Sequence, residues 1–406
     1  MGELKKLPES VVLPLLRLFT RIEQGVAWPK QLQQWLVVLL RKEDGIPEWN
    51  SVRPISVASV VYRVWSRIRT KQLLALCQLT SLPTVGPRLS TRSLWGYVAD
   101  YVAEEMHAGK APSGLVLDIV KAFNVLCRPM VGDVMKHCGI DGALVDAWLR
   151  ALDGMERYVL VAGTVYRADP CLRVSSTGVP EGDPLSVVAM YCMCRFFALW
   201  IQAKANVMPL TYADNWQVLA NETNPVLEAL PHVAHFLTCC ALPISPHKCW
   251  LWSASGEGRK RLKVATLGED RIPVKLQSVD LGADLPYCRR RAAAKRNQRV
   301  SLGDTRLLRA KGVPCSRWHK TRLVLSGVWP QCLHGAETCQ VPLYLFSRDC
   351  VLRQVVRSLL PSRESVLGLP VRSVLIKLLI RHIALSYRGS GCSGSCGAIF
   401  HRVVQG

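Results

Sequence analysis

The stretch Leu210-Thr-Tyr-Ala-Asp-Asn-Trp-Gln-Val-Leu219 decides how the fold is organised. An apolar run reaches the carboxylate of Asp214, and apolar residues resume directly after Asn215. This pattern predicts two short strands joined by a tight turn, with Asp214 and Asn215 at its tip. A carboxylate there is poorly placed for core packing and well placed to hold a cation. Taken alone, the triplet also fits an ordinary turn, so its weight depends on two stretches upstream.

The first upstream stretch is Gly114-Leu-Val-Leu-Asp-Ile-Val-Lys-Ala-Phe-Asn124, where a buried-looking strand delivers Asp118 before a helical segment begins. The second is Ser176-Thr-Gly-Val-Pro-Glu-Gly-Asp-Pro-Leu-Ser186, a loop built on glycine and proline that leads into an apolar helix at 187–201. Two acids on neighbouring strands beside such a loop favour a two-metal phosphoryl-transfer site. Two Mg²⁺ about 4 Å apart would activate a 3′-hydroxyl and stabilise the leaving pyrophosphate.

In this order the three stretches resemble motifs A, B and C of the reverse transcriptase palm, most of all those of non-LTR (LINE-type) retrotransposons. The resemblance implies an α+β, right-hand polymerase fold. Residues 1–285 would form the fingers and a palm with an antiparallel sheet, and residues 286–406 a basic helical thumb with a C-terminal extension. The implied function is RNA-directed DNA synthesis, in which deoxynucleotides are added to a primer 3′-hydroxyl on an RNA template.

The resemblance also assigns roles to individual residues. The metal ligands, for Mg²⁺ or Mn²⁺, would be Asp118, the backbone carbonyl of Ile119, Asp214 and Asn215. The nucleotide would be held or selected by Arg53, Lys42, Phe123, Glu181 and Gly182. Lys248, in a segment that resembles motif D, would donate a proton to pyrophosphate.

Several of these roles have a plain structural alternative. Pro54 biases Arg53 toward an extended conformation, which suits a guanidinium that binds triphosphate, but the chemistry alone favours a surface arginine beside a helix start. The ring of Phe123 would crowd a ribose 2′-hydroxyl, or it packs in the core. Lys248 is either the proton donor or one more surface cation.

Three positions depart from the pattern of the family. Asn124 replaces an aspartate, and Glu181 replaces a glutamine. Asn215 replaces the second aspartate of Tyr-Ala-Asp-Asp, so the site loses a formal negative charge and a stronger metal ligand. The segment Val279-Asp-Leu-Gly282 resembles the strand that closes the palm, which often reads Tyr-Leu-Gly in such enzymes. We therefore expect activity to be reduced or lost.

Two alternative functions remain open at this point. One is a catalytically dead protein that keeps the fold and binds RNA or an RNA–DNA duplex. The other is an RNA-templated RNA polymerase, which shares the palm but is disfavoured by Phe123. Salt-sensitive nucleic-acid binding is common to all of these, so binding alone does not separate them.

The charge of the chain indicates a polyanionic partner. The 406 residues carry 52 Lys and Arg against 30 Asp and Glu, a net charge of +22. A basic stretch from 289 to 322 is expected to track a duplex backbone, although a solvated basic face is the alternative. Its first nucleic-acid-binding candidates are Arg289, Arg290, Arg291, Lys295, Arg296 and Arg299. The expected partners are an RNA template, a DNA primer and deoxynucleoside triphosphates, with oligomeric state left open.

The 16 cysteines are scattered, and no secretory or membrane-spanning segment is expected. They predict reduced, mostly buried side chains in an intracellular protein of the nucleus or cytoplasm rather than a secreted one, with no membrane partner. Two clusters are weak candidates for zinc: the one at 239–249 has poor ligand spacing, and the one at 392–401 lacks a fourth ligand. Helical spacing predicts a helix at 93–107, and the runs on either side of Gly163 predict a hairpin at 158–167.

Overall fold

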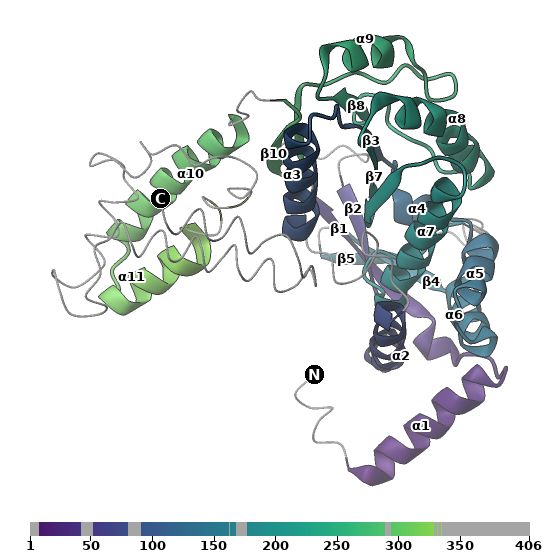
Figure 1. Ribbon diagram of the computed structural model, residues 1–406. Helices are drawn as coiled ribbons and strands as arrows, with labels where there is room; N and C mark the ends of the chain where they lie inside the picture. The colour runs from purple at the N-terminus through teal and green to yellow at the C-terminus, as the bar shows by residue number, and fades with distance from the viewer. Residues whose placement is uncertain are drawn as a thin grey trace.

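The computed structural model describes residues 8–41, 52–79, 91–161, 163–167, 177–288, 294–328, 331 and 334. Within these ranges, helices and strands form two four-stranded sheets, a separate hairpin and a set of packed helices (Figure 1). The described chain is therefore of mixed α and β structure, as expected.

The central sheet has the strand order β6-β7-β3-β8, and all its pairs are antiparallel. Its strands are β3 (Ser113–Asp118), β6 (Met208–Tyr212), β7 (Asn215–Ala220) and β8 (Trp250–Ser253). The predicted strand pair of the 210–219 stretch is confirmed, with one correction. Asn215 is not in the turn but is the first residue of β7, because it pairs in register with both Tyr212 and Asp118.

Side chains alternate across this sheet, so its two faces have different covers. One face, with Leu115, Leu117 and Trp216, belongs to the main core under α7 (Pro184–Gln202) and α8 (Thr223–Cys239). The other face, with Val116 and Leu219, packs against α3 (Thr91–His107) and the hairpin of β9 (Gln277–Asp280) and β10 (Ala283–Pro286). The end of β3 that carries Asp118 therefore lies between two packed layers.

The helix α7 is, among the described residues, the one long and apolar enough by composition to cross a membrane. However, 67% of its most apolar stretch is buried inside the protein. Its neighbours are α2 (Val60–Leu79), α5 (Arg128–His137) and α8. Its composition is therefore explained by its place at the centre of the main core.

The second sheet has the order β2-β1-β4-β5. Its strands are β1 (Gln34–Arg41), β2 (Val52–Val57), β4 (Glu156–Val161) and β5 (Thr164–Arg167). The β4–β5 pair confirms the predicted hairpin around Gly163, whereas the parallel pairing of β1 with β4 joins segments more than a hundred residues apart. In the same part of the protein, η2 (Lys30–Leu32) contacts β1, and α1 (Glu9–Glu23) packs against α6 (Gly142–Asp153). The short helix α4 (Ala122–Val125) follows β3 in the chain.

In α2, the buried side is not decided by apolar residues alone. Val60 and Ile68 are exposed, while Tyr62, Trp65 and Ser66 are buried. The helix turns this side inward because Tyr62 and Ser66 bind the carboxylate of Asp183 at the start of α7. A polar partner on another element thus decides which side of the helix is buried.

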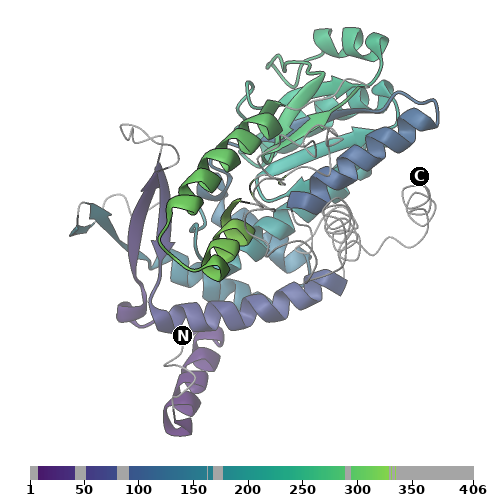
Figure 2. The same cartoon turned by 90° about the vertical axis from the view of Figure 1, so that its left-hand side faces the viewer.

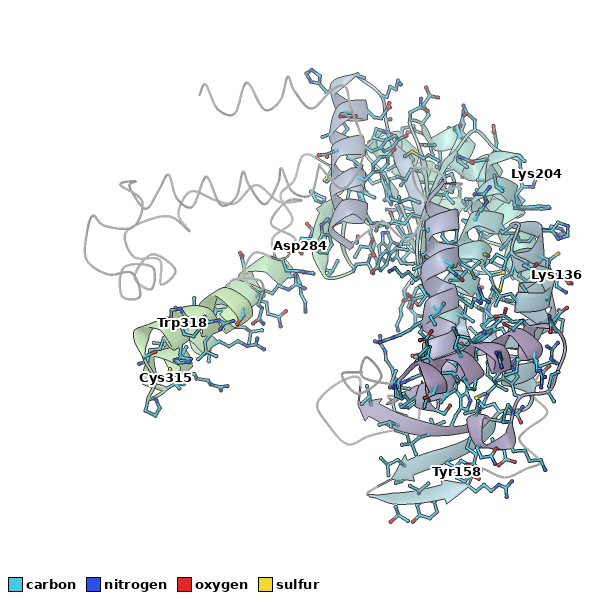
Figure 3. The ribbon with its side chains drawn as sticks, turned by 90° about the horizontal axis from the view of Figure 1, so that it is seen from below. Lys136, Tyr158, Lys204, Asp284, Cys315 and Trp318 are labelled. Atoms are coloured by element: carbon cyan, nitrogen blue, oxygen red, sulfur yellow. The ribbon has the colours of Figure 1, made fainter. Side chains whose placement is uncertain are left out.

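The remaining elements are α9 (Gly256–Val264), α10 (Ala294–Gly312), α11 (Arg317–Leu323) and a π-helical turn, η5 (Val324–Val328). Figures 1 and 2 show α10 and α11 beside the body, on the side of α3 and β10. Figure 3 shows Asp284 where α10 meets the body and Trp318 farther out. The described part of the basic stretch is therefore mostly helical, in α10 and α11.

Candidate active site

The turn between β6 and β7 exposes Asp214. Ala213 has a positive φ of 51°, a conformation that residues other than glycine seldom adopt. Its carbonyl accepts bonds from the Trp216 indole at 2.9 Å and from the Cys194 thiol at 3.5 Å. These two bonds hold the turn in place and leave the Asp214 side chain exposed at its tip.

Asp118 ends β3 beside this turn. It is the register partner of Asn215, and the N–H of Ile119 donates to the carbonyl of Asp214 at 3.5 Å. The two acids therefore occupy the same end of neighbouring strands, although they lie far apart in the sequence. Their backbones therefore lie side by side at this strand end. Metal binding by Asp118, Ile119, Asp214 and Asn215 stays a prediction.

The motif D segment lies directly behind Asp118. Ile119 bridges Ile244, the Asp118 carbonyl accepts from Ser245 N–H at 3.3 Å, and the Asp118 N–H donates to the Cys249 sulfur at 3.3 Å. Burial is the main cause that raises the pKa of the Cys249 thiol, so this sulfur adds no charge to the site. Lys248 is exposed in the preceding turn, close in sequence to these contacts, and its proton-donor role stays a prediction.

A third carboxylate, Asp280, was not among the predicted site residues. It lies on β9 with 2% of its surface exposed. Asn215 Nδ2 donates to its Oδ1 at 2.7 Å, and Gln217 Nε2 donates to its Oδ2 at 2.6 Å and to Asn215 Oδ1 at 3.1 Å. Burial, and to a lesser degree the charge of Asp118, raises the pKa of Asp280 to about 6, against the lowering effect of these bonds. The signal that could have identified it is an acid inside the apolar Val279–Leu281 run.

The loop before α7 is fixed against two other elements. Gly178 has φ 84° and Gly182 φ 110°, and a Cβ on Gly182 would meet the Ser56 carbonyl at 2.6 Å. Ser56 N–H donates to the Glu181 carbonyl at 2.7 Å, and Val179 N–H donates to that of Phe123 at 2.7 Å. The half-buried Phe123 packs against the main core at the same time. Both glycines are thus required by backbone shape and close approach.

Asp183 anchors this loop from beneath. Its buried carboxylate accepts from the Ser66 hydroxyl at 2.5 Å, the Trp148 indole at 2.8 Å and the Tyr62 hydroxyl at 3.0 Å. Burial is the main cause that raises the pKa of Asp183 above its usual value, and these three bonds lower it. Three separate helices therefore meet at one charge immediately after Gly182.

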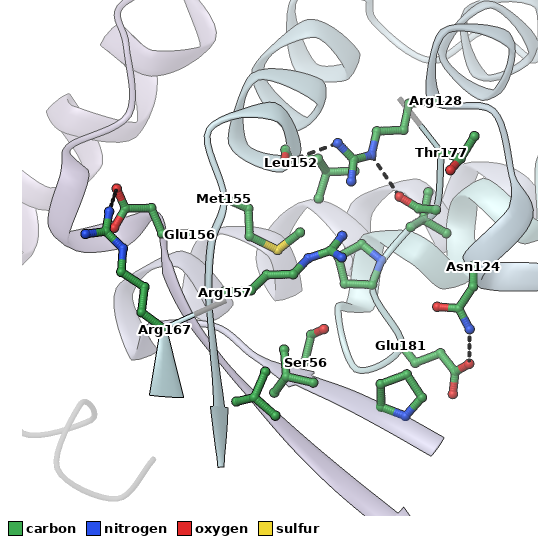
Figure 4. Close-up of a pocket in the computed structure, with 16 residues that line it drawn as sticks. Ser56, Asn124, Arg128, Leu152, Met155, Glu156, Arg157, Arg167, Thr177 and Glu181 are labelled. Carbon is green, nitrogen blue, oxygen red and sulfur yellow. Dashed lines mark hydrogen bonds and ion pairs between the residues drawn. The ribbon is translucent and has the colours of Figure 1, made fainter. Parts of the chain in front are cut away.

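A cavity of about 330 Å³ lies between this loop and the β1–β2–β4 sheet (Figure 4). Its lining includes Ser56, Asn124, Arg157 and Glu181. Asn124 Nδ2 donates to Glu181 Oε1 at 3.2 Å, so these two side chains meet at the cavity wall. Burial, together with nearby Arg128, lowers the pKa of Arg157.

The other predicted residues do not join this site in the described part of the chain. Arg53 is exposed on β2, opposite Leu40, and no hydrogen bond or ion pair of its side chain is found among the described residues. Lys42, Arg289, Arg290 and Arg291 lie outside those residues, as does the cysteine cluster at 392–401. Lys295 and Arg299 lie on α10 and contact Gln298 and the His334 carbonyl. Arg296 is in the same helix.

The metal-binding potential of the site can be judged from its donors. Among the described residues, no three His, Cys, Asp or Glu side chains gather closely enough to hold a metal by themselves. Two carboxylates, completed by water and the oxygens of a triphosphate, are a donor set that Mg²⁺ commonly takes. The residues present therefore fit a metal that arrives with its nucleotide.

Comparisons with known proteins show the family of the chain. A family model described as "Reverse transcriptase (RNA-dependent DNA polymerase)" matches residues 40–273. The Retrovirus-related Pol polyprotein from type-1 retrotransposable element R2 of Popillia japonica is 23% identical over 232 residues, which is 54% of this chain and 32% of that protein. The chain thus spans about a third of that relative's length.

Among solved structures, apo telomerase of Candida tropicalis, truncated from its C-terminal domain, aligns with a TM-score of 0.42 and 11% identity. The alignment covers 66% of this chain and 56% of the telomerase chain.

Proposed function

The chain belongs to the reverse transcriptase (RNA-dependent DNA polymerase) family, and we propose that it extends a primer 3′-hydroxyl with deoxynucleotides on an RNA template. One observation carries the proposal: the register of β3 with β7 brings Asp118 and Asp214 to the same strand end. Two acids at that place, beside a glycine-shaped loop, are the arrangement that two-metal phosphoryl transfer uses.

Asp118 and Asp214 would hold Mg²⁺, or Mn²⁺ in its place. When bound, the metal activates the attacking hydroxyl and neutralises charge on the phosphates. The residues of the chain supply the geometry. The Trp216 and Cys194 bonds hold the Asp214 turn, and Cys249 with Ser245 holds the end of β3. Phe123 would select against a ribose 2′-hydroxyl, and Arg53 with Lys42 would neutralise the triphosphate.

The architecture fits a right-hand polymerase. The β6-β7-β3-β8 sheet with α7 and α8 would be the palm, and the β2-β1-β4-β5 sheet with α2 would belong to the fingers. The hairpin β9–β10 would close the palm near residue 285, and α10 with α11 would begin a basic thumb. The distant R2 relative supports an origin of this protein in a non-LTR retrotransposon.

The second candidate function is a catalytically dead protein that binds RNA or an RNA–DNA duplex. It is favoured by Asn215, because an uncharged amide replaces a carboxylate beside Asp118. Both candidates predict binding that weakens as salt increases, since many cations would contact phosphates. Turnover is therefore the property that separates them.

A primer-extension assay on poly(rA)/oligo(dT) with Mg²⁺ or Mn²⁺ makes this separation. The wild-type chain should extend the primer, and Asp214→Ala should give the background while it binds the duplex with equal affinity. Wild-type extension no greater than that of Asp214→Ala, in either metal, would show that the protein binds without polymerising. Equal use of ribonucleotides and deoxynucleotides would support an RNA polymerase instead.

A further inference from the structure

The pair of Asn215 and Asp280 holds one negative charge at a fixed place. Asp280 is buried, and both its oxygens accept from amide groups of β7. A carboxylate at 215 would set two anions in contact at 2.7 Å, in a place shielded from water. The contact therefore accepts one carboxylate and one amide, but not two carboxylates.

The pair of Asn124 and Glu181 likewise joins an amide to a carboxylate. Asn124 Nδ2 donates to Glu181 Oε1 at 3.2 Å, and both side chains are half-buried at the cavity wall. Three of these four residues are the departures from the reverse transcriptase pattern found in the sequence, Asn124, Glu181 and Asn215. The fourth, Asp280, stands where the Tyr-Leu-Gly of such enzymes has its tyrosine. In each pair an amide stands at an aspartate position, and the carboxylate stands at a position that is usually uncharged. Since these four residues form two hydrogen-bonded pairs, we infer that the carboxylate gained in each pair compensates for the aspartate replaced by its partner.

The Asp280 carboxylate lies on the same side of the sheet as Asp118. Asn215 and Asp118 are register partners, so their side chains share one face of the sheet, and Asp280 is bound to Asn215. The amide of Asn215 is held at both ends, because its oxygen accepts from Gln217 and its nitrogen donates to Asp280.

We propose that the negative charge of each pair has moved across its hydrogen bond rather than been lost, and that Asp280 and Glu181 are positioning residues for this site. The proposal deepens the proposed function and rests on it. Asp280 fixes Asn215 and keeps a negative charge next to Asp118. Glu181 fixes Asn124, which follows Phe123 in the chain, against the loop before α7.

A double-substitution cycle on the full chain, without metal or nucleic acid, tests the Asn215–Asp280 pair by thermal unfolding. Asn215→Asp should lower Tm by about 6 °C, because two carboxylates then meet in a buried place. Asp280→Asn should lower Tm by about 3 °C, because one amide donor then faces another. The combined variant reverses the polarity of the bond and should return to within about 2 °C of the wild type.

Asp284 provides the matched control. It is a buried carboxylate of the same hairpin, and since its register partner is Val279, it faces away from Asp280. Asp284→Asn should not rescue Asn215→Asp. Additive Tm losses in the Asn215→Asp/Asp280→Asn variant, or equal rescue by Asp284→Asn, would overturn the proposal. If Asn215→Asp cannot be purified, a soluble combined variant supports the pair, and failure of both contradicts it.

The second pair is tested in the same way with Asn124→Asp, Glu181→Gln and their combination. The Tm shifts should be smaller, about 2 °C or less for each single change, because both side chains are partly in contact with water. The combination should restore the Tm and the primer extension of the wild type. Independent, additive losses in both measurements would show that Glu181 does not position Asn124.

Primer extension with the same proteins separates this inference from the proposed function. Asn215→Asp alone should reduce extension, and the combined Asn215→Asp/Asp280→Asn variant should recover it. An Asn215→Asp protein with higher activity than the wild type and an unchanged Tm would overturn the pairing. If every variant is inactive but the Tm values show rescue, the pairing stands and the proposed function fails. If the wild type is active but the Tm losses are additive, the pairing fails and the proposed function stands.

Discussion

The end of β3 and the helix α10 use charge in opposite ways. At the strand end, Asp118, Asp214 and Asp280 are each held by specific bonds or by a fixed turn. Along α10, cations such as Arg306 and Arg309 are exposed and project from a regular helix. Under the proposed function, the position of each charge would determine the chemistry in the first region, whereas the total charge would determine nucleic-acid affinity in the second. The two regions should therefore respond very differently to the loss of a single charge.

The largest effect is expected from Asp118→Ala or Asp214→Ala. Either change removes a carboxylate from the strand end and should lower primer extension on the order of 10³-fold, because a positioned charge is lost from the transition state. Duplex affinity should be unchanged. Glu269→Ala, which removes an exposed acid elsewhere, is the control and should retain full activity. A similar loss of primer extension in Glu269→Ala would contradict a specific role for the carboxylates at the strand end.

Phe123→Ala sharpens the comparison at an uncharged position. Removal of the ring should admit a ribose 2′-hydroxyl and raise relative ribonucleotide incorporation about 10- to 100-fold. Phe123→Tyr keeps the bulk and should retain the preference for deoxynucleotides. Competitive incorporation of the two nucleotide types gives the ratio. If Phe123→Ala has a lower Tm but the same preference for deoxynucleotides, the ring contributes only to core packing.

Asp183→Asn extends the comparison to a positioned charge that touches no substrate. One amide donor would face an N–H donor of the network, which should cost about 2 kcal/mol, or roughly 4 °C in Tm. Burial raises the folded-state pKa of Asp183, so the wild type loses stability as pH rises through that pKa. The Tm advantage of the wild type should thus be greatest near pH 4 and decrease as pH rises. A pH-independent gap would contradict the assigned shift.

The smallest effect is expected in the basic helix. The double variant Arg306→Gln/Arg309→Gln should weaken duplex binding only severalfold at low salt. The slope of log affinity against log salt should fall by about 0.7 to 0.9 for each phosphate contact removed. Fluorescence anisotropy at several salt concentrations measures both quantities. An unchanged slope would mean that this face of α10 does not contact nucleic acid.

Local pattern predicted much of the fold. The β6–β7 hairpin, the β4–β5 hairpin, α3 and the apolar helix α7 each carry their own periodicity or turn signal, and the structure has all of them. The parallel pairing of β1 with β4 was not predictable in this way, because no local pattern records a contact between segments so far apart. The side of α2 that faces inward is not recorded in its local pattern either, since Asp183, on another element, orients the helix.

The candidate site shows the same division. Asp118 and Asp214 were identified by motif order, and the register of β3 with β7 brings them together. Asp280 was missed because its partner, Asn215, belongs to a strand 65 residues earlier. The contact of Asn124 with Glu181 was missed because each looked like an isolated departure. Side chains from distant elements complete each arrangement, and only the assembled fold shows this.

Metal-directed backbone cleavage tests the central claim most directly. Fe²⁺ that replaces Mg²⁺, with ascorbate and peroxide, generates radicals that cut the chain near the bound ion, whether or not the protein turns over. A metal held jointly by Asp118 and Asp214 predicts cuts close to both residues that excess Mg²⁺ suppresses and that Asp214→Ala abolishes. Cuts confined to other segments, or cuts that persist in Asp214→Ala, would contradict a metal site shared by these two carboxylates.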